Sequence, residues 1–144
     1  MAANQFSENQ KKQIVDAIKA AELNTSGEIR VHIENSCKED VLDRAASIFE
    51  KLEMHKTELR NGVLFYIATK DHKFAILGDA GINAKVADDF WDEIKEKMLI
   101  HLKNKDIVTA LTSGLSMSGN ALKKHFPYQE DDVNELSDDI SFGE

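Results

Sequence analysis

Hydrophobic residues recur at every third or fourth position in four segments of the chain, and this spacing predicts four amphipathic helices. The first helix has a defined start, because Ser7 followed by Gln10 is the pattern of a capping box. The last helix is followed by Pro127, which cannot continue a helix. The predicted helices cover residues 7–22, 39–53, about 87–102 and 106–124.

A different pattern predicts the β-strands. Apolar and polar residues alternate over residues 29–34, which is typical of a strand with one buried face and one face in water. Residues 63–68 are continuously apolar, as in an interior strand that is covered on both faces. A polar turn then leads into a third strand over residues 74–77.

These elements define the expected fold. The helix between the first two strands makes them parallel, whereas the short turn makes the third strand antiparallel. We therefore predict an α/β fold, a three-layer αβα sandwich in which about four helices flank a mixed central sheet of about four strands.

The 144 residues, of which 42% are hydrophobic, suit one globular domain with its own core. We assign that domain to residues 1–127. Residues 128–144 are rich in Asp and Glu and are expected to form an acidic tail that is mobile or loosely docked. The alternative is that Leu136, Ile140 and Phe142 dock on the domain as an edge strand.

The net charge of −8 narrows the range of partners. Nucleic-acid binding depends on Lys and Arg that neutralise phosphates, so we expect no nucleic-acid partner. No segment reaches the roughly 18 apolar residues of a membrane span, so we expect no membrane insertion. The lone Cys37 cannot form an internal disulfide, and no secretory leader pattern opens the chain. We therefore expect a cytoplasmic monomer.

Candidate chemistry lies where three connections meet. The predicted topology brings residues 24–28, 54–61 and 78–89 to one end of the sheet, because the reversed third strand ends beside the starts of the other two. Acidic side chains gathered there repel each other and need a cation. Ca²⁺ and Mg²⁺ prefer oxygen ligands, and we expect one or two such ions. The candidate metal ligands are Asp79, Asp88, Asp89, Glu58 and Glu28.

Other roles for these side chains stay open. An aspartate near a helix start, such as Asp88 or Asp89, commonly caps the helix or interacts with its dipole. Asp79 stands in a glycine-bearing turn, where aspartate is also a common turn residue. Glu58 suits a solvated or ion-paired side chain, and Arg60 can balance the carboxylates in place of a metal ion.

Four stretches of the sequence together resemble the TPM domain family. The resemblance covers approximately residues 14–126 and implies an αβα sandwich around a mixed sheet. It also implies divalent-metal binding, as in some members, and acid phosphatase activity, as in a plant member. The stretches are Ser26-Gly27-Glu28-Ile29-Arg30-Val31, Arg60-Asn61-Gly62-Val63-Leu64-Phe65-Tyr66-Ile67-Ala68, Phe74-Ala75-Ile76-Leu77-Gly78-Asp79-Ala80-Gly81-Ile82 and Asp89-Phe90-Trp91.

Members of this family are commonly secreted or lumenal and often carry a membrane anchor, and this sequence shows neither signal. We therefore expect a stand-alone TPM domain that binds Ca²⁺ or Mg²⁺ at its acidic loops and acts as a metal-modulated binding or regulatory module, with an unidentified protein partner. The alternative is a weak metal-assisted acid phosphatase acting on phosphomonoesters. No phosphatase motif accompanies Asp79, so its catalytic residues stay unassigned. A third interpretation treats the acids as solubility and capping features.

Overall fold

The middle layer of the molecule is a mixed sheet. The computed structural model describes residues 5–128 and 136–143. The strands are β1 (Glu28–Glu34), β2 (Gly62–Ala68), β3 (Lys73–Gly78) and β4 (Ser141–Phe142). They are ordered β3-β2-β1-β4, with β1 and β2 parallel, β3 antiparallel beside β2, and β4 parallel at the other edge of β1. The predicted crossover and hairpin are confirmed.

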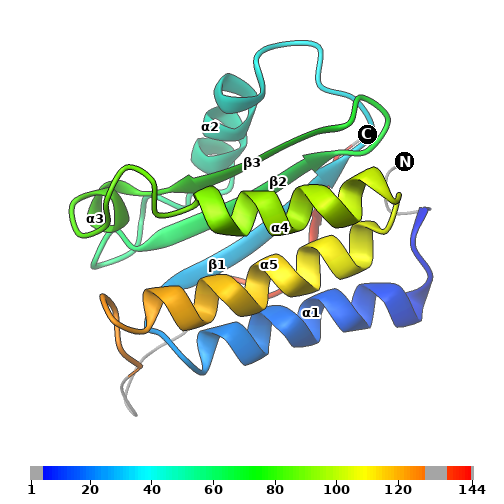
Figure 1. Cartoon of the computed structure of the whole chain (residues 1–144). Coiled ribbons are helices and arrows are strands. Elements are labelled where there is room, and N and C mark those ends of the chain that lie inside the picture. The colour runs from blue at the N-terminus through cyan, green and yellow to red at the C-terminus, as the bar shows by residue number, and fades with distance from the viewer. Residues whose placement is uncertain (1–4, 129–135, 144) are drawn as a thin grey trace.

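Helices cover both faces of this sheet (Figure 1). On one face lies α2 (Val41–Lys51), and on the other lie α1 (Glu8–Glu22), α4 (Asp92–Lys103) and α5 (Ile107–Leu122). The three-layer αβα sandwich predicted from the sequence is therefore confirmed. Within the described residues, no helix is both long enough and apolar enough to cross a membrane.

The helix starts agree only partly with the sequence patterns. Ser7 caps α1 and forms a reciprocal capping box with Gln10, as predicted. The start predicted for the third long helix is wrong: α4 begins at Asp92, and its N-cap Trp91 makes no side-chain capping bond. A short helix, α3 (Ala80–Asn83), was not predicted, because one helical turn is too short to show a hydrophobic period.

The end of the chain belongs to the sheet. Ser141 and Phe142 form β4 beside β1. Ile140 and Phe142 pack against the core formed with α1, α4 and α5, while Leu136 packs against the core beneath α2. The edge-strand alternative therefore describes this segment. The rest of the predicted acidic tail, apart from Tyr128 and the 136–143 segment, lies outside the described residues.

The polar face of β1 is buried, in contrast to the prediction of a face in water. Ile29, Val31 and Ile33 join the core with α1, α4 and α5. His32 and Glu34 point to the opposite face, where α2 and β4 supply hydrogen-bond partners, and both are buried as well. His32 and Glu34 are therefore shielded from water by α2 and β4.

Candidate functional site

The three predicted connections meet at one end of the sheet, here called the loop end (residues 24–28, 54–61 and 78–89). The Glu28 N–H donates to the Asn61 carbonyl at 3.0 Å, and the Asn61 side-chain nitrogen donates to the Ser26 carbonyl at 3.0 Å. The Gly81 N–H donates to the Arg60 carbonyl at 2.8 Å. These bonds join the three connections, so the convergence expected from the topology is confirmed.

Gly81 permits the closest of these contacts. A Cβ atom at this position would lie 2.1 Å from the Leu59 carbonyl oxygen and 2.6 Å from the Arg60 carbonyl oxygen. Any larger residue would push the two loops apart. The backbone of the loop end is thus held in place by a residue without a side chain.

Asp79 is one of the two candidate ligands that are buried at the loop end, the other being Glu28. Arg60 Nε donates to Asp79 Oδ2 at 2.7 Å, and Arg60 Nη2 donates to Oδ1 at 2.7 Å. The Ala80 N–H also donates to Oδ1 at 2.7 Å, so Asp79 caps α3. Burial raises the pKa of the Asp79 carboxyl, but the hydrogen bonds from Arg60 and Ala80 outweigh it and hold the pKa below its ordinary value.

The structure does not bring the five candidate ligands together into one cluster. Glu58, Asp88 and Asp89 are exposed, whereas Glu28 is buried at the start of β1. Among residues 5–128 and 136–143, no group of three or more His, Cys, Asp or Glu side chains is placed to hold a metal ion. The cationic group that contacts Asp79 in the structure is the Arg60 guanidinium, which the sequence had suggested in place of a metal ion.

Neither Asp88 nor Asp89 caps α4, so the capping alternative is wrong for these two loop aspartates. The first turn of α4 follows Trp91, and no side chain caps it. Asp88 and Asp89 instead lie in the turns that precede the helix, where the Asp89 carbonyl accepts from the Asp92 N–H at 3.1 Å. Their carboxylates therefore project from an exposed loop.

Asn61 was not among the sequence candidates. It is 2% exposed, and its side-chain oxygen accepts no hydrogen bond from any residue that the structure describes. Buried polar atoms of this kind normally have a partner. Its position next to Arg60 could have marked it in the sequence, although an asparagine before a strand is too common to stand out.

A second polar cluster, also missed from the sequence, lies at the opposite end of β1. Here called the Glu34 network, it consists of Glu34, His32, Arg44, Tyr66 and Ser141. Arg44 Nε and Nη2 donate to the two Glu34 oxygens at 2.8 and 2.9 Å, and the Tyr66 hydroxyl donates to the same carboxylate. Burial raises the pKa of Glu34, but these hydrogen bonds outweigh it and lower the pKa to about 2.

His32 completes the Glu34 network. Its Nε2 lies 3.1 Å from Glu34 Oε1, and its Nδ1 lies 2.8 Å from Ser141 Oγ. An ionised carboxylate only accepts hydrogen bonds, so Nε2 carries the proton and Nδ1 accepts from the Ser141 hydroxyl. Burial lowers the pKa of His32, which keeps the ring neutral. The network is internally satisfied, so it joins α2 and β4 to the sheet and leaves no activated group.

A comparison with protein-family models decides the family. The model of the TPM domain matches residues 1–121 of the chain. The chain belongs to the TPM domain family. The resemblance of its four sequence stretches is thereby confirmed. A comparison with curated proteins finds no match.

Solved structures of similar shape include one relative and two domains that share the fold. The chain is 46% identical to the BA42 protein of the psychrophilic bacterium Bizionia argentinensis, whose NMR structure superposes with a TM-score of 0.91 over 96% of this chain and 95% of that one. The N-terminal domain of cg2496 from Corynebacterium glutamicum is 14% identical, with a TM-score of 0.66 over 98% of this chain and 82% of that one. An N-terminal domain from P. gingivalis is 14% identical, with a TM-score of 0.69 over 87% and 82%. The last two show the fold alone.

The acid phosphatase alternative stays a prediction for this TPM domain. A phosphatase needs a nucleophile or an activated water, together with a proton donor for the leaving group. Asp79 is the candidate that the loop end offers, and both of its oxygens accept hydrogen bonds from Arg60. The test is to measure the hydrolysis of a chromogenic phosphomonoester by the wild type and by Asp79→Ala. The alternative predicts that the wild type is active and that the variant has lost the activity. The expected cytoplasmic location, monomeric state and protein partner also stay predictions.

Proposed function

We propose that this TPM domain is a divalent-cation-binding module, in which Ca²⁺ or Mg²⁺ takes the place of the Arg60 guanidinium on Asp79. The observation that carries the proposal is the exposure of the two partners. The Asp79 side chain is 6% exposed, whereas the Arg60 side chain is 50% exposed. A fixed, ionised carboxylate is therefore neutralised by a cation that can move into solvent.

The exchange is energetically feasible. Water solvates the half-exposed Arg60 when it leaves, so the cost of the exchange falls on the buried Asp79 carboxylate, and the entering cation compensates that charge. A divalent cation brings twice the charge of the guanidinium to the same carboxylate. Removal of Arg60 from Asp79 would uncover both carboxylate oxygens while leaving the capping bond from the Ala80 N–H in place.

Further oxygen ligands are available at the loop end. Ca²⁺ takes about six to eight oxygen ligands from carboxylates, side-chain amides, backbone carbonyls and water. The unpartnered side-chain oxygen of Asn61 has the required chemistry, next to Arg60 in the sequence. Glu58, Asp88 and Asp89 lie on the same connections and are exposed, and in this proposal the loops move to bring one or more of them to the ion.

Binding of this kind would regulate the surface of the domain. The loop end is held together by a few backbone bonds, so an ion that draws in an exposed carboxylate also changes the loop that carries it. Such a change is a means of switching a surface for a protein partner. Glu28, although a sequence candidate, is buried in β1 and is less suited to move.

Thermal unfolding tests the proposal. A ligand that binds only the folded state at a hundredfold excess over its dissociation constant stabilises by about 2.7 kcal/mol. We expect Ca²⁺ to raise the melting temperature and a chelator to reverse the rise. Asp79→Asn should reduce the rise, whereas Glu96→Gln, which removes an exposed carboxylate from α4, should not. A melting temperature that Ca²⁺ and Mg²⁺ leave unchanged would refute cation binding.

A further inference from the structure

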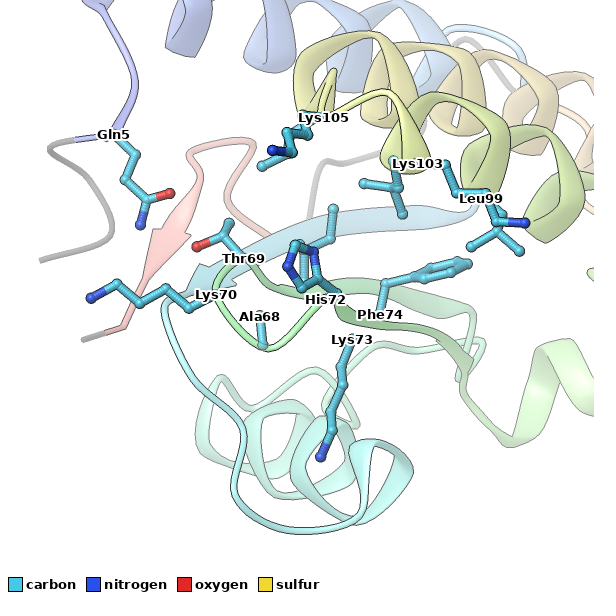
Figure 2. Close-up of a pocket in the computed structure, with 13 residues that line it drawn as sticks. Gln5, Ala68, Thr69, Lys70, His72, Lys73, Phe74, Leu99, Lys103 and Lys105 are labelled. Atoms are coloured by element: carbon cyan, nitrogen blue, oxygen red, sulfur yellow. The ribbon is translucent and has the colours of Figure 1, made fainter.

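A cavity of about 690 Å³ opens at the end of the sheet opposite the loop end (Figure 2). It lies between the turn that joins β2 to β3 and the connection that joins α4 to α5. Its volume falls within the range of roughly 300–1,000 Å³ that is typical of small-molecule sites. The cavity is here called the lysine pocket, after the residues of its rim.

The interior of the lysine pocket is apolar. Ile67 and Phe74 line it from the two strands of the hairpin, and Leu99, Leu102 and Ile107 line it from α4 and α5. Leu99 is 41% exposed, so its side chain is accessible to a ligand. Apolar side chains that face such a space favour the burial of a hydrocarbon group.

The rim of the lysine pocket is cationic, although the whole chain carries a net charge of −8. Lys70, Lys103 and Lys105 line it, together with His72. The side chains of these three lysines form no hydrogen bond or ion pair with any part of the chain that the structure describes. Figure 2 shows His72 pointing toward the helices, whereas Lys73 points to the other side of the sheet.

The nearest acidic residues in the sequence do not neutralise this rim. Asp71 accepts a hydrogen bond from the Cys37 N–H at 2.7 Å. Asp106 accepts from the Thr109 N–H at 3.1 Å and so caps α5. Within the described residues, each carboxylate accepts a hydrogen bond from a backbone N–H and forms no ion pair with a rim lysine.

Two rim residues also have unusual backbone conformations. His72 has φ of 55° and Lys105 has φ of 61°, in the left-handed region that residues with a Cβ rarely adopt. Glycine or asparagine would adopt this conformation more readily at both turns. Conformations of this kind concentrate at functional sites, where they fix the direction of a side chain.

We propose that the lysine pocket binds a small organic anion with an apolar body, of the medium-chain fatty acid or alkyl phosphate type. The hydrocarbon chain lies against Phe74, Leu99 and Ile107, and the anionic head lies at the rim beside the Lys105 ammonium group. Lys103, whose ammonium group points to the other side of the pocket in Figure 2, adds to the positive charge of the rim. A neutral ligand would leave the lysine charges unpaired, and a small inorganic anion would leave the apolar interior empty. The proposal is independent of the loop end and of its cations.

NMR titration of the whole chain without added metal tests this inference. Octanoate and octyl phosphate present the expected combination, octanol lacks the charge, and inorganic phosphate lacks the chain. We expect the amide signals of residues 67–74 and 99–107 to shift with octanoate or octyl phosphate, and the tighter of the two identifies the preferred head group. Octanol and inorganic phosphate should bind at least about fivefold more weakly.

Three variants distinguish specific binding in the lysine pocket from non-specific attraction of the anion to surface lysines. Lys103→Gln/Lys105→Gln should weaken octanoate binding by about five- to tenfold, since two exposed charges are removed. Lys123→Gln/Lys124→Gln at the end of α5 makes the same change in net charge away from the pocket and should leave binding unchanged. Leu99→Gln, at an exposed position, should weaken octanoate binding without unfolding the domain.

The inference is overturned by any of three results. Octanoate and octyl phosphate that shift no signals of the pocket would exclude the ligand class. Octanol that binds as tightly as octanoate would exclude a role for the lysines. An equal loss of binding in the two double variants would show that only net charge attracts the anion.

Discussion

Two arginine–carboxylate pairs lie at opposite ends of the same parallel strands, and they differ in how they are enclosed. At the loop end, Arg60 is 50% exposed and contacts Asp79 through two hydrogen bonds. At the other end, Arg44 is 34% exposed and contacts Glu34, which also accepts from Tyr66 and His32. The first pair can exchange its cation, whereas the second is part of the framework.

The difference shows that a charged pair is not defined by its residue types alone. Both carboxylates are buried and both have pKa values below the ordinary range. Only at Glu34 do donors arrive from α2, β1 and β2, which closes the carboxylate on several sides. The neighbours of the pair therefore decide whether it serves stability or binding.

The largest effect is expected from Glu34→Ala. Removing the carboxylate leaves the buried Tyr66 hydroxyl and the partly exposed Arg44 without their acceptor, which should lower the free energy of unfolding by about 3–5 kcal/mol. Asp79→Ala should lower it by much less, because Arg60 moves into water. Urea unfolding of the two variants measures both values. Equal losses at the two positions would contradict the distinction between the two ends.

The next effect concerns the packing of the loop end. Gly81→Ala places a methyl group against two carbonyl oxygens, so overpacking should lower the free energy of unfolding by about 1–3 kcal/mol. Gly27→Ala is the matched control in a neighbouring loop, because a Cβ there would meet its nearest neighbours at an ordinary 3.5 Å. Chemical denaturation compares them. If both substitutions had the same effect, the close contact at Gly81 would not be limiting.

The pH dependence of stability follows from the lowered pKa values. The pKa of the Glu34 carboxyl is lowered from an ordinary 4.5 to about 2. The stability that the ionised carboxylate contributes is therefore fully present above about pH 4.5 and is lost as the pH falls through 2. Asp79 acts in the same direction below its ordinary 3.8. The difference in the free energy of unfolding between wild type and Glu34→Gln should therefore become smaller as the pH falls from 4.5 to 2. Parallel curves for wild type and Glu34→Gln from pH 7 to 2 would refute this linkage.

The last effect has the opposite sign. Burial, together with a hydrogen bond to the Asp138 side chain, raises the pKa of Glu22 from 4.5 to about 10. The stability from this group is fully present below pH 4.5 and is lost as the pH rises toward 10. Glu22→Gln keeps a donor for Asp138 without titrating, so its stability relative to wild type should increase steadily as the pH rises from 5 to 8. A difference that does not change with pH would exclude this role.

The sequence predicts the framework well because its signals are local. The continuous apolar run of β2 marks an interior strand, and the capping box of Ser7 and Gln10 marks the start of α1. The Glu34 network is different, because its partners come from α2, β2 and β4. Ser141 is 109 residues from His32 along the chain, and no short-range pattern shows that β4 covers this polar face.

For the candidate site, the sequence predicts which loops come together but not how their side chains are arranged. The convergence of the loops follows from strand directions, and Arg60 was recognised as a possible counterion. The clustering of five carboxylates does not follow, since side-chain positions depend on short turns such as α3, which the sequence pattern does not reveal. The orphan oxygen of Asn61 depends on the same local geometry.

Calcium titration of wild type and Arg60→Met, followed by amide NMR, tests the proposed exchange most directly. Methionine keeps the apolar part of the side chain but removes the competing charge from Asp79. The account predicts shifts at residues 58–62 and 78–82, no shifts around Glu34, and tighter binding in Arg60→Met. Binding that is unchanged or weaker in Arg60→Met would contradict the exchange of Arg60 for a divalent cation.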